Sequence, residues 1–159
     1  MTGRKVLIAA IAAVLMITSV IFYNSFVDLD SSHQASNSVV NAIHPMESYQ
    51  KEDYIEHDIL EKLVRKLAHI IEYAALGIAV ILLVKCVEKD YQKKLYATAF
   101  FYVLLVAVLD EHFQSFSGRN SSTDDILLDL GGGLLGGCLG YGIYGLLAKL
   151  KARSKIIKK

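Results

Sequence analysis

The chain has 159 residues, of which 53% are hydrophobic and 21% are charged. A soluble domain of this length is less apolar, so the charged residues must be separated from long apolar stretches. The formal net charge of +1 is unlike the strongly basic balance of most nucleic-acid-binding domains, and we expect no nucleic-acid partner. The length fits a single membrane domain that covers residues 1–159.

Four apolar runs are long enough to cross the hydrocarbon core of a bilayer, which takes about 20 residues of helix. We interpret the first run as an uncleaved anchor, because its apolar part is too long for a signal peptide and no small-residue cleavage site follows it closely. The sequence therefore predicts an all-α integral membrane protein, a bundle of four transmembrane helices. The four spans cover about residues 6–27, 63–87, 95–113 and 126–148.

The loop of residues 28–62 joins the first two spans. Its first half is rich in Ser and Asn, whereas its second half places Ile55, Ile59, Leu60 and Leu63 at roughly the period of a helix. We expect this second half to form an extracytoplasmic amphipathic helix that lies on the membrane surface. The histidines of the loop, which we expect to be exposed to solvent, are His33, His44 and His57.

The distribution of basic residues predicts the orientation, because cytoplasmic loops are enriched in Lys and Arg. With both termini in the cytoplasm, most of the 17 basic residues lie on the inner side and most of the 16 acids lie outside. We therefore expect a multi-pass protein of the cell membrane, with cytoplasmic N- and C-termini. The basic tail of residues 149–159 is a topology signal or a contact for anionic lipids of the inner leaflet.

Ionisable residues within a span cost about 2.5–3.5 kcal/mol each on insertion scales and are therefore candidates for function. In the second span Arg65, His69, Glu72 and Tyr73 fall on one helical face, with Lys66 at its edge. His69 and Glu72 are three residues apart, so their side chains can touch. This face is the first part of a candidate polar site.

The third span supplies a second polar face. It reaches residue 113 only by taking Asp110 and Glu111 into the helix. These two acids share a face with Gln114, whereas His112 points the opposite way. We expect this face to meet that of the second span at the outer membrane interface.

The connection to the fourth span continues this polar region. Gly118 indicates a tight turn, and the residues 121–124 are N-cap candidates for the fourth span. Asp125 falls in its first turn, near the positive end of the helix dipole, and Asp129 lies about one turn deeper. Since unpaired buried charges are costly, we expect a network of ion pairs at this end, for example between Arg119 and Asp125.

The fourth span contains Gly132, Gly136 and Gly140 at intervals of four residues. Such spacing allows the backbones of membrane helices to approach closely. We favour packing within one chain, and homodimerisation is the alternative. Cys86 and Cys138 show no disulfide or metal-ligand spacing, and we interpret them as small apolar packing residues.

The stretches RKLAHIIEYAALG and DEHFQSFSGRNSSTDDILLDLGGGLLG resemble the VanZ-like family of bacterial membrane proteins, named for a teicoplanin-resistance protein. The resemblance covers about residues 63–140. Asp129 departs from it, because the family usually has Asn there, and Phe113 stands where many members have His. The family pattern falls on Arg65, Lys66, His69, Glu72, Tyr73, Asp110, Glu111, Gln114, Gly118, Arg119, Asp125 and Gly132.

The resemblance implies an envelope role, associated with lower susceptibility to lipoglycopeptides such as teicoplanin. We favour binding of a membrane lipid or an envelope glycolipid at the outer leaflet, with Arg and Lys on phosphate. No cofactor and no metal are expected, since a second well-placed histidine for zinc is missing. The candidate polar site comprises Arg65, Lys66, His69, Glu72, Tyr73, Asp110, Glu111, Gln114, Arg119, Asp125 and Asp129.

Two alternatives remain open at this point. A membrane-embedded enzyme would use the pairs His69–Glu72 and Asp110–Glu111 as acid–base or metal-binding groups. A structural or interaction subunit would use the same charges only to hold three helix ends together. No nucleophile stands out among the loop serines, so we lean away from an enzyme.

Overall fold

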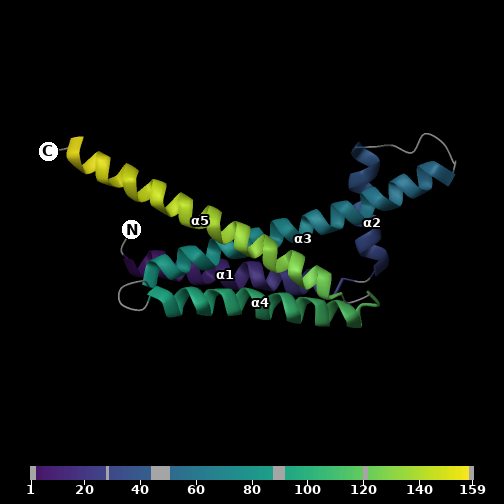
Figure 1. Cartoon of the computed structure of the whole chain (residues 1–159), viewed down its shortest axis with the longest axis horizontal. Helices are drawn as coiled ribbons and strands as arrows, with labels where there is room; N and C mark the ends of the chain where they lie inside the picture. The colour runs from purple at the N-terminus through teal and green to yellow at the C-terminus, as the bar shows by residue number, and fades with distance from the viewer. Residues whose placement is uncertain (1–2, 28, 44–50, 88–91, 120–121, 158–159) are drawn as a thin grey trace.

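A computed structural model of the chain describes residues 3–27, 29–43, 51–87, 92–119 and 122–157, and the regular structure of these residues is entirely helical. Four of the helices are long and apolar enough to cross a membrane, which confirms the predicted bundle of four spans. The two ends of the chain lie at the same end of the bundle (Figure 1). The helices are α1 (Gly3–Ser25), α2 (Leu29–Ile43), α3 (Lys51–Val87), α4 (Gln92–Phe116) and α5 (Thr123–Ile157).

The amphipathic helix predicted to lie on the membrane surface is instead the first part of α3, which runs without a break from residue 51 to residue 87. No Gly or Pro separates the two parts, so nothing in the sequence stops the helix at the start of the span. Its first turns project beyond the bundle, where Ile55 and Ile59 are exposed (Figure 1).

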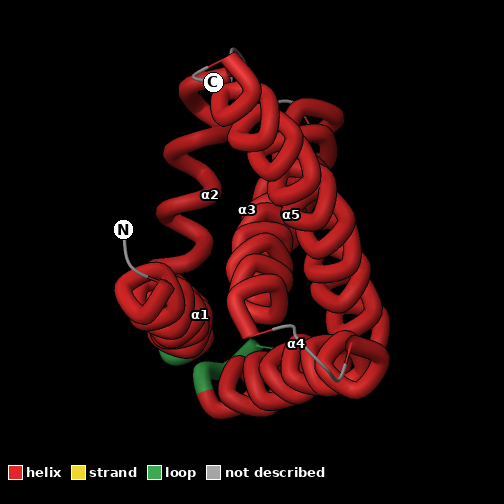
Figure 2. Tube along the Cα trace, turned by 90° about the vertical axis from the view of Figure 1, so that its left-hand side faces the viewer, coloured by secondary structure: helices red, strands yellow, loops and turns green. Residues whose placement is uncertain are grey.

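Helix α2 was not predicted. Its sequence, LDSSHQASNSVVNAI, is short and rich in Ser and Asn, which favour caps and turns over helix interiors. The helix forms because it packs on α3 and buries Ser36 and Val40 (Figure 2). Tertiary contacts of this kind supply most of the stability of short helices in proteins.

The glycines of α5 lie against the backbone of α3. A Cβ atom added to Gly136 would stand 1.9 Å from the carbonyl oxygen of Ala74, and Gly132 and Gly140 also face α3. Gly77 of α3 has the converse role, since a Cβ there would stand 2.0 Å from a backbone oxygen of α5. The stripe therefore packs two helices of one chain, whereas a homodimer stays a prediction.

The surface around the bundle is apolar, as it must be for contact with lipid tails. Leu15, Phe101 and Leu135 are more than half exposed. Cys86 and Cys138, predicted to be packed, are also exposed. The reason is that a lipid-facing surface is as apolar as the interior of a bundle, so an apolar position in the sequence does not imply burial in protein.

Candidate functional site

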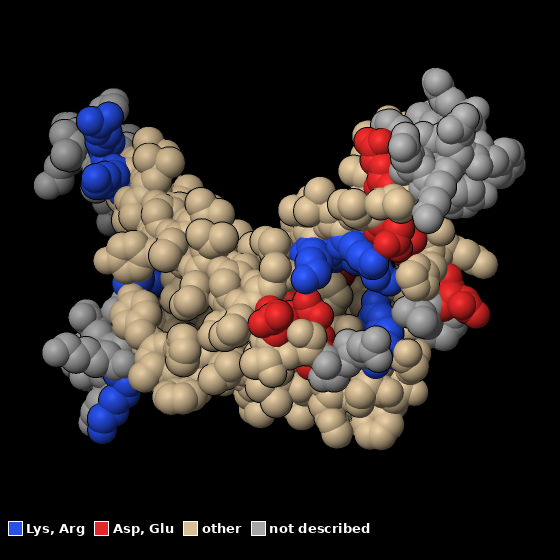
Figure 3. Space-filling view, turned by 45° about the vertical axis from the view of Figure 1, so that its right-hand side comes forward, with Lys and Arg blue, Asp and Glu red and all other residues tan. Residues whose placement is uncertain are grey.

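Acidic and basic side chains mix at one end of the bundle, where α2, the middle of α3 and the start of α5 meet. Figure 3 shows lysines, arginines and acids together there, whereas the opposite end of the same view carries only basic groups among the described residues. The first two helical turns of α5 and the last two of α4 belong to this polar end. It lies away from both termini (Figure 1).

Asp110 is the hub of the buried part of this region. The residue is 1% exposed, although it carries a carboxyl group inside a membrane span. Its Oδ1 accepts hydrogen bonds from the hydroxyl of Ser25 and from Nε2 of Gln114 at 3.0 Å, and its Oδ2 accepts one from the hydroxyl of Tyr73 at 3.0 Å. One carboxylate thus links α1, α3 and α4.

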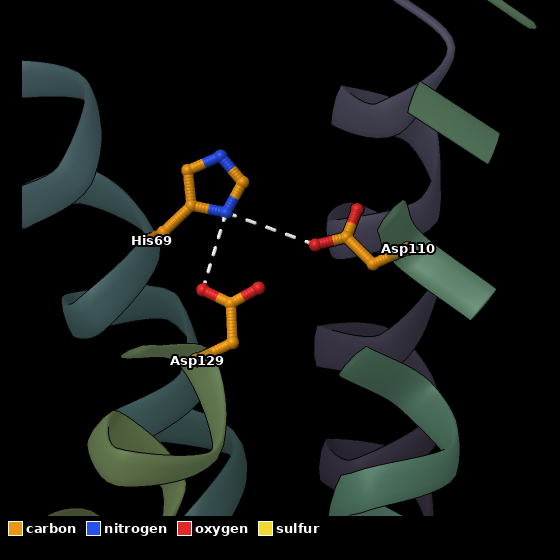
Figure 4. Close-up of side chains that lie close together, drawn as sticks. All are labelled: His69, Asp110 and Asp129. Carbon is orange, nitrogen blue, oxygen red and sulfur yellow. Dashed lines mark ion pairs between the residues drawn. The ribbon is translucent and has the colours of Figure 1, made fainter. Parts of the chain in front are cut away.

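His69 lies between Asp110 and a second buried carboxylate, Asp129 of α5. Its Nδ1 is 3.5 Å from Oδ1 of Asp129 and 3.7 Å from Oδ2 of Asp110 (Figure 4). Asp129 is 1% exposed, and neither of its side-chain oxygens has a hydrogen-bond partner among the described residues. The three groups come from three different helices and converge on one point.

Glu72 and Glu111 of the predicted site each accept a hydrogen bond from a residue of another part of the chain. Oε1 of Glu72 accepts a hydrogen bond from Nδ2 of Asn24 at 2.7 Å, which ties α3 to α1. Oε2 of Glu111 accepts one at 2.9 Å from the backbone N–H of Ser122, directly before α5 begins. Within the described residues, no ion pair or hydrogen bond joins His69 to Glu72, because the imidazole faces α5 rather than its own helix.

Two local features place the start of α5. Gly118 has a φ of +76°, a left-handed conformation that suits glycine, and so makes the predicted turn. The hydroxyl of Ser122, one of the N-cap candidates, accepts a hydrogen bond from the backbone N–H of Asp124 at 3.2 Å. The connection therefore bends sharply after α4 and leaves Arg119 beside the cavity.

The predicted pair of Arg119 and Asp125 is wrong. Asp125 pairs with Lys66, whose Nζ lies 3.2 Å from Oδ1, and Nη2 of Arg119 donates to the hydroxyl of Ser32 at 2.7 Å. Lys66 has the same charge as Arg119 and lies on the neighbouring helix, so the sequence could not separate the two. Burial, and next the charge of Arg65, lower the pKa of Arg119 from its ordinary value, yet an arginine stays protonated.

Helix α2 supplies site residues that sequence reasoning missed. Besides Ser32, it contributes His33, which was expected to be exposed but pairs through Nδ1 with the buried Glu61 of α3. Nε2 of the same ring lies 3.4 Å from Nη1 of Arg65. The signal was the polar composition of residues 30–38, which are unusually rich in Ser for a helix.

The two remaining loop histidines differ. His57 forms an exposed contact with Asn41 at 3.1 Å, and His44 lies outside the described residues. Helix α4 follows its prediction: Asp110, Glu111 and Gln114 are buried, and His112 is exposed.

A cavity of about 420 Å³ opens at this end, and eight of the eleven predicted site residues line it. Glu72 lines an adjacent cavity of about 370 Å³ with Asn24 and Arg119, whereas Tyr73 and Asp110 are buried and line neither of these two cavities. The walls of the first cavity are His33, Lys62, Arg65, Lys66, His69, Glu111, Gln114, Gly118, Arg119, Asp125, Leu128 and Asp129.

Comparison with known proteins identifies the family of the chain. The family model described as VanZ/LLP1 matches residues 10–148, which is most of the chain. No curated protein and no solved structure matches it.

Proposed function

Because the chain belongs to the VanZ/LLP1 family, we propose that it binds the phosphate-bearing headgroup of an envelope lipid or glycolipid in the 420 Å³ cavity. Four cationic side chains and three acidic ones face this cavity from α3, α4, α5 and the turn before α5. The volume falls in the range of small-molecule sites.

The observation that carries this proposal is the state of Arg119. The guanidinium is half-buried, and among the described residues no carboxylate oxygen lies within 4 Å of it, since its partner is the hydroxyl of Ser32. By contrast, Lys62, Arg65 and Lys66 each have a carboxylate partner, at 2.6, 3.8 and 3.2 Å. A partly desolvated guanidinium with no carboxylate in direct contact among the described residues favours a bidentate anion such as phosphate.

The other walls of the cavity suit a headgroup with hydroxyls. Gln114 donates one N–H to Asp110 and retains a carbonyl oxygen, and Asp125 is partly exposed beside Lys66. Sugar or glycerol hydroxyls would bind such groups as donors and acceptors. Exposed apolar side chains cover the membrane-spanning helices, so the acyl chains of the bound lipid would remain in the bilayer.

We place this site at the outer leaflet of the cell membrane, with both termini in the cytoplasm. Support comes from the basic residues near the termini and in the turn between α3 and α4, which the positive-inside rule assigns to the cytoplasm. Occupation of the site by an envelope glycolipid would then lower susceptibility to lipoglycopeptides such as teicoplanin.

Lipid binding to purified protein tests the proposal. After delipidation in detergent, native mass spectrometry is run with phosphatidylglycerol, with phosphatidylcholine and with an uncharged diglucosyl diacylglycerol. We expect retention of phosphatidylglycerol by the wild type and a loss of about tenfold in Arg119→Ala, equal to about 1.4 kcal/mol. Arg119→Lys should recover part of the binding, because it restores charge without the bidentate geometry.

The matched control is Lys62→Ala, since Lys62 lines the same cavity but is exposed and paired with Asp58 at 2.6 Å. It should change retention less than Arg119→Ala. Equal retention of all three lipids, or equal loss in both variants, would contradict the proposal. Teicoplanin susceptibility of cells with wild type or Arg119→Ala at matched protein level tests the cellular role.

An enzyme is the second candidate, favoured by one observation: His69 lies beside two buried carboxylates, an arrangement typical of an oriented general base. Lipid profiles of cells with wild type or His69→Ala distinguish it from binding. A lipid product that depends on His69 would support the enzyme, and identical profiles would oppose it.

A further inference from the structure

His69, Asp110 and Asp129 converge on one point at the edge of the proposed headgroup site, and the headgroup proposal does not explain this convergence. One ligand atom from each of the three lies within 4.8 Å of the other two. Figure 4 shows the imidazole nitrogen of His69 turned toward both carboxylates. The groups come from α3, α4 and α5, so the fold as a whole brings them together.

Asp129 is the member of this cluster whose polar atoms are least satisfied. The residue is 1% exposed, and both of its carboxylate oxygens are without hydrogen-bond partners among the described residues. Its contact with His69, at 3.5 Å, is at the outer limit of hydrogen-bond distance. A buried carboxylate in this state is costly, and each such group calls for a physical explanation.

The spacing of the ligand atoms fits a metal ion. Two ligands that each lie about 2.0–2.2 Å from a tetrahedral cation are about 3.3–3.6 Å apart. The distances from Nδ1 of His69 to the oxygens of Asp129 and Asp110 are 3.5 and 3.7 Å. Small rotations of the side chains would bring all three atoms onto one ion.

The hydrogen bonds around Asp110 resemble those that orient the ligands of metal sites. Ser25, Tyr73 and Gln114 donate hydrogen bonds to its two oxygens and so fix the orientation of the carboxylate. Outer partners of this kind commonly orient metal ligands. Two carboxylates beside one imidazole leave excess negative charge, which a divalent cation would neutralise.

We propose that His69, Asp110 and Asp129 bind one divalent first-row transition-metal ion. An imidazole with two carboxylates suits Zn²⁺ or Mn²⁺ better than Ca²⁺, which prefers oxygen ligands alone. His69 and Asp129 also line the 420 Å³ cavity, which provides access for the ion and room for water at a further coordination position. The site brings His69 and Asp110 together with Asp129, whereas the sequence pattern paired them with Glu72 and Glu111.

Metal analysis of the full chain in detergent tests this site. The protein is stripped with EDTA, incubated separately with Zn²⁺, Mn²⁺ and Mg²⁺, desalted and measured by inductively coupled plasma mass spectrometry. We expect the wild type to retain about one Zn²⁺ or Mn²⁺ per chain, and His69→Gln and Asp129→Asn to lose at least about tenfold in affinity. Incubation with Co²⁺ should give visible absorption bands in the wild type and not in His69→Gln or Asp129→Asn.

Two controls match these variants. His112→Gln removes an exposed histidine of α4, and Asp124→Asn removes an exposed acid of α5, so both should keep the ion. Retention of less than about 0.2 ions by the wild type, retention unaffected by both site substitutions, or retention of Mg²⁺ without Zn²⁺ or Mn²⁺ would each overturn the proposal. Size-exclusion profiles identify any variant that fails to fold. Metal retention by the wild type tests the proposal even if a variant does not fold. The assay contains no lipid, so its outcome is independent of headgroup binding.

Discussion

Helices α3 and α5 contact each other in two different ways along their length. In the middle of the bundle their backbones touch through glycines, as at Gly136 and Ala74. At the polar end they are joined by side chains, such as Lys66 with Asp125. The first contact depends on shape alone, and the second depends on charge and leaves a cavity beside it.

These two kinds of contact should tolerate amino-acid substitutions to different degrees. A backbone contact has no flexible atom that can move aside, so any added side chain must separate the helices. An ion pair at the rim of a cavity has room and water nearby, and each partner can adopt another rotamer. We therefore expect the close backbone contact between α3 and α5 at Gly136 to contribute most to stability, and the polar end to tolerate the changes that ligand binding requires.

The largest effect should come from Gly136→Leu. Its Cβ would stand 1.9 Å from the carbonyl oxygen of Ala74, so α5 must move away from α3, at a cost of about 3 kcal/mol or more. We expect little folded protein by size exclusion and thermal unfolding in detergent. Gly142→Leu is the control, because nothing lies within 4 Å of a Cβ there. If both variants unfold to a similar extent, the close contact of α5 with α3 at Gly136 does not depend on the absence of a side chain there.

An intermediate effect should follow Tyr73→Phe, which removes the hydrogen bond to Oδ2 of Asp110 and keeps the ring. Since the acceptor is a buried carboxylate, the loss should destabilise the fold by about 1–3 kcal/mol. Thermal unfolding measures it, with Tyr23→Phe at an exposed position of α1 as the control. An unfolding temperature equal to that of the control would show that Asp110 does not hold α3 and α4 together.

The smallest effect on stability should come from Lys66→Ala. Its pair with Asp125 is half-exposed, and such pairs contribute at most about 1 kcal/mol. Phosphatidylglycerol retention should nevertheless fall, because Lys66 lines the cavity. The double variant Lys66→Asp with Asp125→Lys exchanges the two charges and keeps the ion pair. Restored lipid binding would indicate that the pair only joins α3 to α5. Continued loss would indicate that Lys66 itself contacts the ligand.

The sequence alone was sufficient for the four spans and for the polar faces of α3 and α4. Both follow from strong local signals: about 20 apolar residues are needed to cross a bilayer, and helical periodicity places Asp110, Glu111 and Gln114 together. The turn at Gly118 and the helix cap at Ser122 could also be predicted from the sequence, because turns and caps need particular residue types.

The sequence did not predict which side chains pair with one another across helices. Several groups of like charge compete for each opposite charge, so the sequence could not decide that Lys66 rather than Arg119 pairs with Asp125. Helix α2 was missed for a related reason, since it depends on packing against α3 and not on its own propensity.

Composition and periodicity were thus enough to predict a four-span membrane bundle with acidic and basic side chains together at one end, because membrane insertion depends on local hydrophobicity. Only the tertiary structure decided that His69 faces Asp110 and Asp129 instead of Glu72. The physical reason is that the rotation of each helix is set by its neighbours: the glycines of α5 bring it so close to α3 that Asp129 reaches the imidazole.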